Sequence, residues 1–277
     1  MSDVDDDALA DAYNKGLELE KSGDQDGAEL YYRQALILDP SDPGGVSIRL
    51  AAMGREPSPQ TMPEAYVSTL FDQHADVFDD ILVNDLGYCV PLLLRELVRK
   101  LDLGPFERLL DLGCGTGLTG VAFADCASHL TGVDLSERII ELAYDHEVYD
   151  DLYVGEAVSF LKDFEGDDGT QSVWNLVAAT DVFPYLGAIE PIVSGAARRL
   201  APNGYFAFST ETLPESKLAG RDYMVGVKQR FAQGEQYLRK VLLAEGFVIL
   251  AMDPITVRLE DGEPVPGHLV VAQLAAG

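Results

Sequence analysis

The sequence predicts an α/β fold with a doubly wound, mostly parallel sheet, and two patterns support this prediction. From Arg108 onward, short apolar runs of strand length alternate with helical segments, as expected for parallel strands joined by helical crossovers. The last two apolar runs, Phe247–Met252 (extending toward Leu259) and Leu269–Leu274, are separated by residues 260–267. Because this gap is too short for a helical crossover, the two final strands should be antiparallel.

Each element of the main domain is placed by its apolar pattern and by the turn residues that bound it. We expect parallel strands at residues 108–112, 129–134, 151–155, 173–179 and 204–210. We expect helices near residues 117–125, 136–144, 156–163, 187–200 and 235–245. A chain of 277 residues, 47% of them hydrophobic, is long enough for one large domain of this class with an appendage.

The N-terminal segment predicts a helical hairpin. Residues 7–38 carry helical periodicity in two blocks that are split by the turn signal Ser22-Gly23-Asp24. Small, aromatic and breaker residues then occur at the offsets of a repeat of about 34 residues: Gly16, Leu19, Gly23, Ala28, Tyr32, Ala35 and Pro40. The segment therefore resembles one tetratricopeptide repeat. A single repeat cannot bury its own apolar face, so it should pack on the rest of this chain, on a second copy or on a protein partner.

A proline-rich break at residues 56–63 follows, and then a helical stretch over residues 64–83 with an aromatic stripe. Tyr66, Phe71, His74 and Phe78 form this stripe, and a further helix from about Tyr88 to Leu101 leads into the main domain. The spacing is typical of a core-facing helix, and it also fits a lid over a binding site. The predicted division is a helical appendage (1–56), a lid and lead-in segment (57–104) and a ligand-binding domain (105–277).

Composition excludes several classes of function. The chain has 47 acidic and 20 basic residues, for a formal charge of −27, which disfavours binding to nucleic acid or to an anionic membrane. The excess of acidic residues is also consistent with a role in solubility alone or with adaptation to high salt. Three cysteines without a CxxC pair and four scattered histidines predict neither a disulfide framework nor a metal site. The acidic N-terminus and the absence of a long apolar run predict a cytoplasmic protein.

The strongest chemical signal is the glycine-rich segment Leu109-Leu-Asp-Leu-Gly-Cys-Gly-Thr-Gly117, in which a strand leads through a turn into a helix. Asp134 ends the next strand, where it could bind ribose hydroxyls or simply favour the N-terminus of the following helix. Gly115, Gly117 and Gly120 also satisfy the GxGxxG spacing of dinucleotide sites. Charge decides between a dinucleotide and a nucleoside-containing cofactor that carries positive charge. Asp111 would repel the pyrophosphate of a dinucleotide by about 4 kcal/mol at 4 Å, whereas it would attract a sulfonium that carries an ammonium.

Further motifs accompany this segment: Gly155-Glu156-Ala157, Ala179-Thr-Asp-Val-Phe-Pro-Tyr-Leu-Gly187, Arg199-Leu-Ala-Pro-Asn-Gly204, Phe71-Asp-x-x-Ala-x-x-Phe-Asp79 and Leu86-Gly-Tyr88. Together they resemble class I S-adenosylmethionine-dependent methyltransferases, and more narrowly bacterial methyltransferases with a short tetratricopeptide segment. This resemblance implies a Rossmann-like, seven-stranded sheet with strand order 3-2-1-4-5-7-6. It implies cofactor contacts from Phe71, Asp111, Gly113, Cys114, Gly115, Gly117, Asp134, Leu135, Glu156, Ala157 and Asp181.

The resemblance also implies individual roles. Asp111 would reach the amino group of the cofactor directly or through water, and Asp134 would bind its ribose. Glu156 would meet the adenine amino group, with the Ala157 N–H at a ring nitrogen; alternatively, Glu156 is only a first-turn acid of the next helix. Asp181 would lie near the sulfonium.

Methyl transfer needs mainly positioning and exclusion of water, although an oxygen or nitrogen acceptor can require a general base. His74 and Asp181 are the candidate catalytic residues, and Glu211 is a further candidate base. Arg230 and Tyr223 could line an acceptor pocket, although a surface ion pair is the simpler interpretation of Arg230. A small-molecule methyl acceptor is preferred. The alternatives are a protein substrate recruited through residues 1–56, and a protein that binds the cofactor without catalysis.

Overall fold

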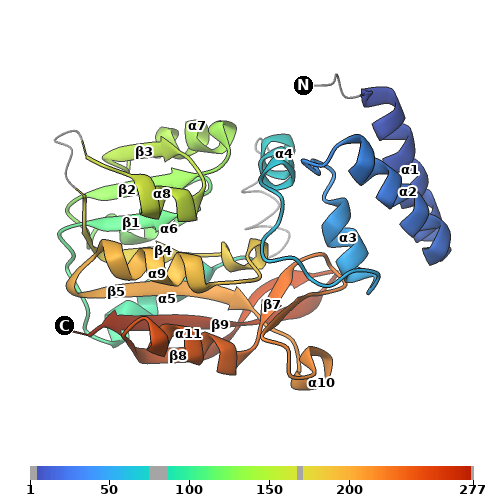
Figure 1. Ribbon diagram of the computed structural model, residues 1–277. Helices are drawn as coiled ribbons and strands as arrows, with labels where there is room; N and C mark the ends of the chain where they lie inside the picture. The colour runs from blue at the N-terminus through green and yellow to red at the C-terminus, as the bar shows by residue number, and fades with distance from the viewer. Residues whose placement is uncertain (1–4, 75–86, 167–170, 276–277) are drawn as a thin grey trace.

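The computed structural model describes residues 5–74, 87–166 and 171–275, and its centre is one seven-stranded sheet. The sheet has the spatial order β3-β2-β1-β4-β5-β9-β8, in which β1 to β5 pair in parallel and β9 pairs antiparallel with both β5 and β8. Counted within this sheet alone, the order is the predicted 3-2-1-4-5-7-6. The predicted doubly wound α/β fold is therefore confirmed (Figure 1).

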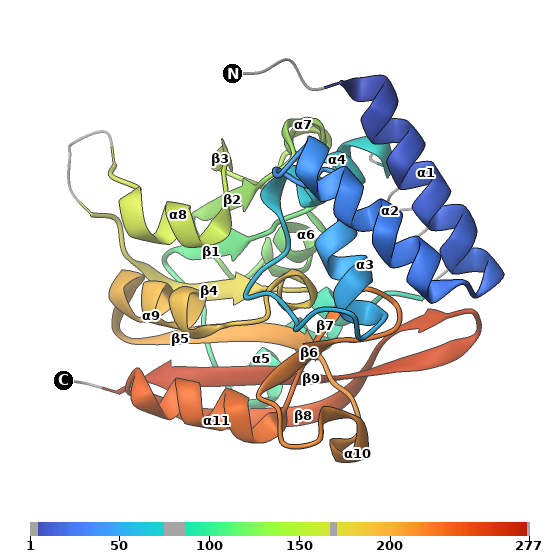
Figure 2. The same cartoon turned by 45° about the vertical axis from the view of Figure 1, so that its right-hand side comes forward.

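The parallel strands agree with the expected apolar runs: β1 (Leu109–Leu112), β2 (Leu130–Asp134), β3 (Asp151–Val154), β4 (Trp174–Ala179) and β5 (Leu200–Glu211). Helices cover both faces of this sheet (Figures 1 and 2). One buried cluster joins the sheet to α8 (Ala157–Asp163), α9 (Glu190–Arg199) and α11 (Glu235–Ala244). A second joins it to α5 (Val90–Lys100) and α6 (Leu118–Phe123), whereas α7 (Glu137–Asp145) follows β2.

The final hairpin is longer than expected. β8 (Phe247–Glu260) and β9 (Glu263–Leu274) are antiparallel, as predicted, but only Asp261 and Gly262 separate them. Both turn residues have positive φ, 53° and 81°, which is the Asp-Gly geometry of a tight hairpin. The expected gap at 260–267 was therefore wrong. Its two prolines lie where β9 pairs only with β8, and such one-sided pairing tolerates proline.

The segment between β5 and α11 contains a small sheet that the sequence did not predict. The short helix α10 (Glu215–Leu218) precedes β6 (Tyr223–Val225) and β7 (Phe231–Gln233), which pair antiparallel. Strands of three residues are too short for a recognisable alternation of apolar and polar residues. This two-stranded sheet brings the Arg230 loop to the main domain.

The N-terminal hairpin is present as α1 (Asp6–Ser22) and α2 (Gln25–Leu38), and α3 (Val46–Ala52) follows. A Cβ at Gly16 would lie 2.5 Å from Cδ1 of Tyr32, so the two helices approach as closely as the small residue predicts. Ile48 and Ala51 of α3 pack on Val225 and Phe231 of the small sheet. The appendage thus packs within the chain. Its tetratricopeptide identity, its boundary at residue 56 and its protein partner stay predictions.

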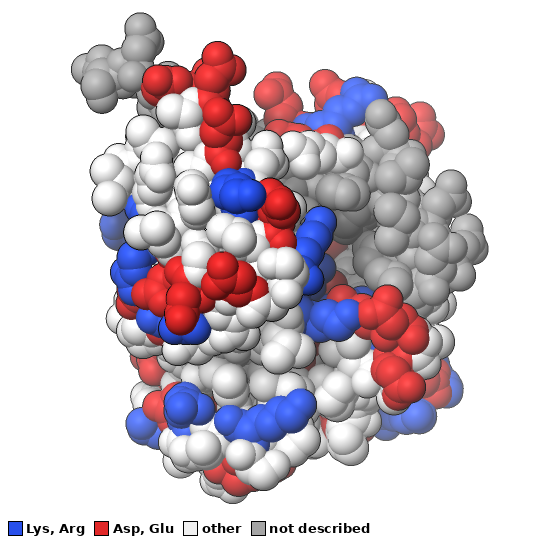
Figure 3. Space-filling model, turned by 90° about the vertical axis from the view of Figure 1, so that its right-hand side faces the viewer, with Lys and Arg blue, Asp and Glu red and all other residues white. Residues whose placement is uncertain are grey.

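Helix α4 (Glu64–His74) contains the first part of the aromatic stripe, whereas residues 75–86, which include Phe78, lie outside the described residues. In Figures 1 and 2, α4 lies between the N-terminal helices and the main sheet. Acidic and basic side chains are intermixed on the face shown in Figure 3, with no continuous basic patch. None of the helices in the described residues is long and apolar enough to cross a membrane.

One tyrosine fills the space that three glycines leave open. A Cβ at Gly120 would lie 2.5 Å from Cζ of Tyr149, and a Cβ at Gly132 would lie 3.0 Å from its Cε1. The third position is Gly117, where the corresponding distance is 3.2 Å. The last glycine of the GxGxxG spacing therefore accommodates Tyr149, and this packing joins β1, β2 and α6 directly behind the glycine-rich turn.

Gly120→Ala should destabilise the protein because the new methyl group would clash with the Tyr149 ring. Overpacking of this kind costs about 1–3 kcal/mol, which chemical denaturation would measure. Gly155→Ala is the matched control, since a Cβ there meets nothing within 4 Å. Combining Gly120→Ala with Tyr149→Ala should cost less than the sum of the two single changes. If the two losses of stability simply added, the proposed close packing of Gly120 on Tyr149 would be contradicted.

Candidate active site

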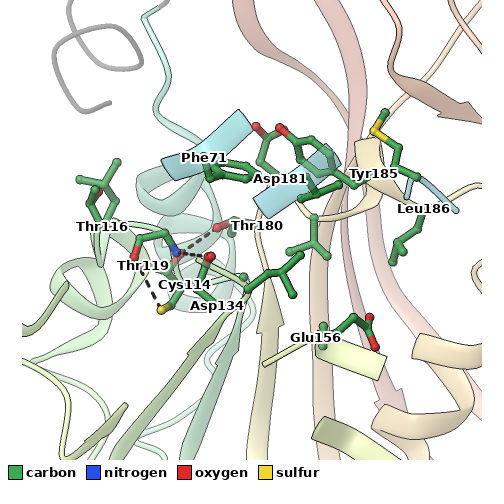
Figure 4. Close-up of a pocket in the computed structure, with 18 of the residues that line it drawn as sticks. Phe71, Cys114, Thr116, Thr119, Asp134, Glu156, Thr180, Asp181, Tyr185 and Leu186 are labelled. Carbon is green, nitrogen blue, oxygen red and sulfur yellow. Dashed lines mark hydrogen bonds between the residues drawn. The ribbon is translucent and has the colours of Figure 1, made fainter. Parts of the chain in front are cut away.

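A cavity opens where the parallel strands end, and its lining residues come from segments far apart in the sequence (Figure 4). Its floor comes from the loops after β1, β2, β3 and β4, and its roof from residues 61–71. The residues that line the cavity include Phe71, Gly113, Cys114, Gly115, Asp134, Leu135, Glu156, Ala157, Asp181, Tyr185, Arg230 and Arg258. Ligand sites of open α/β sheets are expected at this edge.

The glycine turn (residues 113–117) requires glycine for its backbone conformation. Gly113, Gly115 and Gly117 have φ values of 62°, 55° and 103°, which side chains disfavour. A Cβ at Gly113 would also lie 2.5 Å from Cγ2 of Val182. Gly113, Cys114 and Gly115 face the cavity, as the predicted cofactor contacts require. Gly117 is not among the lining residues; it precedes α6 and faces Tyr149.

Asp134 binds the glycine turn and also faces the cavity. Its Oδ2 accepts a hydrogen bond from the Gly115 N–H at 3.0 Å, and its Oδ1 accepts one from the Ser136 N–H at 3.0 Å. Burial raises the pKa of this carboxyl, whereas the backbone N–H groups lower it. Each carboxylate oxygen can accept two hydrogen bonds, so Asp134 can organise the turn and still accept ligand hydroxyls.

Asp111 lies behind the turn instead of in the cavity. Its side chain is fully buried and is not among the lining residues, so the contact with a cofactor amino group, direct or through water, stays a prediction. The Tyr149 hydroxyl donates to Asp111 Oδ2 at 2.7 Å, while Oδ1 has no hydrogen-bond partner among the described residues. Burial raises the pKa of Asp111 to about 7. The sequence analysis missed Tyr149, because no motif marks it.

Glu156 serves as a helix cap as well as a lining residue. Its two carboxylate oxygens accept hydrogen bonds from the N–H groups of Val158 at 2.9 Å and Ser159 at 2.7 Å, which caps α8. The alternative interpretation as an acid of the first helical turn therefore has structural support. The adjacent Ala157 lines the cavity, and its N–H is not used by this cap.

The roof of the cavity includes one of the predicted aromatic residues. Phe71 of α4 lines the cavity and contacts Tyr185, with ring centroids 5.4 Å apart. His74 is the last residue of α4, and its side chain lies outside the described part of the chain. The structure therefore supports a roof position for Phe71 and gives no placement for the His74 imidazole.

Charged groups gather along one wall of the cavity, which we call the acceptor end (Asp181, Tyr185, Arg230 and Arg258). Arg258 of β8 donates from Nη2 to Glu211 Oε1 at 2.6 Å, and its Nη1 lies 3.7 Å from Asp181 Oδ1. Arg230 donates to the Tyr185 hydroxyl at 2.6 Å. Arg230 therefore lies in the cavity and not in the expected surface ion pair, because β6 and β7 carry its loop inward.

Two other candidates are placed away from the cavity. Glu211 pairs with Arg258 behind the acceptor end, and Tyr223 packs edge-on against Phe231. Among the described residues, no cluster of three His, Cys, Asp or Glu side chains could hold a metal ion. Arg258 and Tyr185 were not predicted as site residues; Tyr185 lies within the motif at 179–187, and no motif marks Arg258.

The buried Asp111 predicts a dependence of stability on pH. Its folded pKa of about 7 exceeds the ordinary value of 3.8, so the folded protein keeps a proton that the unfolded chain loses between these values. The free energy of unfolding should therefore fall as pH rises toward 7. Asp111→Asn should remove this contribution, on the order of 2 kcal/mol between pH 5.5 and 8. Denaturant titrations at both pH values measure it, and equal pH dependence in the two proteins would contradict it.

Comparison with known proteins identifies the segment that carries this cavity. Residues 110–206 match the family model described as a methyltransferase domain. A ubiquinone biosynthesis O-methyltransferase of Xylella fastidiosa is 29% identical over 139 residues, which cover 49% of this chain and 55% of that protein. A protein of the same name from Bordetella avium is 23% identical over 164 residues, 57% of this chain and 67% of that protein. The chain thus spans about half the length of the first of these relatives.

Solved structures share the fold at low identity. An S-adenosylmethionine-dependent methyltransferase from Clostridium acetobutylicum has a TM-score of 0.53 at 14% identity, covering 75% of this chain and 100% of its own. The (4+2)-cyclase SpnF has a TM-score of 0.60 at 15% identity, covering 80% and 98%. At these identities the likeness shows the fold alone. Taken with the strand order, it shows that this chain has the Rossmann-like fold of class I methyltransferases, and residues 110–206 are similar to a methyltransferase domain.

Proposed function

We propose that the protein transfers a methyl group from S-adenosylmethionine to a small-molecule acceptor. The observation that carries this proposal is the charge distribution along the cavity. Asp134, which binds the glycine turn, and Glu156 line the cavity, whereas its arginines among the described residues, Arg230 and Arg258, lie near the carboxylates of Glu211 and Asp181. A pyrophosphate at the turn would meet carboxylates without a compensating cation, whereas a sulfonium with an ammonium is attracted there.

The residues present fit this cofactor. Asp134 accepts the ribose hydroxyls on the lone pairs that the Gly115 and Ser136 N–H groups leave free. The Ala157 N–H, which the Glu156 cap does not use, is available to an adenine ring nitrogen. Phe71 and Leu135 cover the bound molecule and exclude water. Bound S-adenosylmethionine supplies a methyl carbon on a positively charged sulfur, so the leaving group is already activated.

Among the residues that the structure describes, Asp181 is the one best placed to accept a proton from the acceptor. It follows β4, lines the cavity and lies beside the aromatic roof formed by Phe71 and Tyr185 (Figure 4). The acceptor is held between this roof and the cofactor, in line with the bond that breaks, and exclusion of water favours the displacement. The curated relatives are named for biosynthetic O-methylation, which supports a small molecule over a protein as the acceptor.

Turnover tests the proposal directly. The protein is incubated with S-adenosylmethionine labelled in its methyl group and with the small-molecule fraction of a bacterial extract. The label should move into a small product in proportion to enzyme. Label in precipitated protein alone would instead favour a protein substrate, and bound cofactor without any transfer would favour a non-catalytic role.

Asp134→Ala should weaken cofactor binding, because it removes hydrogen bonds to a charged group. Such bonds contribute about 1.5–3 kcal/mol, or roughly 10- to 150-fold in Kd by calorimetry. Asp145→Ala is the control, since Asp145 is an exposed carboxyl at the end of α7. A folded Asp134→Ala variant whose Kd changes less than twofold would show that the ribose role is misassigned.

A further inference from the structure

The acceptor end holds a guanidinium that is anchored on one side only. Arg258 is 3% exposed, and Glu211 of β5 fixes its Nη2 through a 2.6 Å hydrogen bond. Its Nη1 has no hydrogen-bond partner among the described residues, although Arg258 lines the cavity. A buried donor without a partner is costly, so its persistence at a cavity wall points to a ligand group or to a charge that it serves.

The charged group near Arg258 Nη1 is the carboxylate of Asp181, and the backbone of Asp181 fixes its position. Asp181 has a φ of 60°, an unusual value for a residue with a side chain, and its N–H donates to Ser209 Oγ at 2.9 Å. Its Oδ1 lies 3.7 Å from Arg258 Nη1 and has no hydrogen bond among the described residues. The side chain keeps 20% exposure and lines the cavity. A cavity carboxylate with this geometry is suited to accept a hydrogen bond from a ligand.

A second guanidinium lies at the same end. Arg230 donates to the Tyr185 hydroxyl at 2.6 Å and lies over the Tyr185 ring, 5.1 Å from its centroid. Its Nε is 3.9 Å from Glu211 Oε1, so Glu211 lies near both arginines from behind the cavity wall. The wall itself therefore presents two guanidinium groups and the Asp181 carboxylate.

We propose that the methyl acceptor is a hydroxyl group, which donates its proton to Asp181 while its oxygen faces the guanidinium groups of Arg230 and Arg258. This inference rests on the proposed methyl transfer and names the acceptor chemistry of that same site. The acceptor oxygen forms a bond to the methyl carbon as the methyl–sulfur bond breaks, and the electron pair of that bond stays on sulfur as a neutral thioether. The O–H proton moves to Asp181 and then to solvent.

Charge disfavours an amine or a carboxylate as the acceptor. Nitrogen becomes positive as it attacks a sulfonium, so an amine would develop its charge beside two guanidinium groups. A carboxylate needs no base and would meet Asp181 as a like charge. A hydroxyl becomes negative as its proton leaves, and the arginines stabilise that developing charge while Asp181 takes the proton.

The labelled product tests this inference. Methyl-labelled S-adenosylmethionine, the protein and the small-molecule fraction of a bacterial extract are incubated together, and mass spectrometry identifies the methylated atom. A methyl ether is expected. A methylated amine, ester or thiol would overturn the hydroxyl inference while methyl transfer itself stands. The absence of any labelled product would overturn the proposed function and this inference with it.

Variants test the two roles separately. Asp181→Asn should lower kcat by about 100-fold or more, a larger factor than any change in cofactor Kd, because a general base acts only in the chemical step. Asp181→Glu should recover part of the loss. Asp253→Asn, at an exposed acid of β8, is the control. Arg230→Gln, which leaves the anchored Arg258 in place, should lower kcat about tenfold or more. Unchanged turnover in both folded variants would contradict the proposal.

Discussion

The hydrogen bond from the Gly115 N–H to Asp134 is the interaction on which the rest of the site depends. It joins the end of β2 to the turn that follows β1, and so determines the shape of the cavity floor. The same carboxylate gives that floor its negative charge. Asp111 lies behind the turn, where the Tyr149 hydroxyl donates a hydrogen bond to it. One pair of strand ends therefore supplies both the backbone approach and the electrostatic preference that a cationic cofactor requires.

The fold was predictable because parallel strands buried on both faces appear in the sequence as separate apolar runs. Their order follows from a resemblance, and the sheet bears it out. The glycine turn was predictable for a local reason, since three positive φ values at residues 113, 115 and 117 require glycine. By contrast, the burial of Asp111 depends on Tyr149, which lies 38 residues further along the chain. No local pattern encodes such a contact.

The residues of the acceptor end could not be grouped from the sequence, because tertiary structure alone brings them together. Arg258 and Asp181 come together only because β9 pairs with β5 and places β8 at the edge of the sheet. Arg230 turns inward because two strands of three residues carry its loop. Fold likeness does not resolve the chemistry either, since a cyclase and a methyltransferase share this fold at comparable identity. The substrate class therefore has to be argued from the side chains that line the cavity.

The account requires that the cavity prefer a positively charged cofactor over a phosphorylated one. Paired calorimetric titrations of the wild-type protein with S-adenosylmethionine and with NADH, at one ionic strength, measure this preference. The account predicts saturable binding of S-adenosylmethionine and no detectable heat of binding with NADH. Tight binding of NADH, with no binding of S-adenosylmethionine, would contradict it.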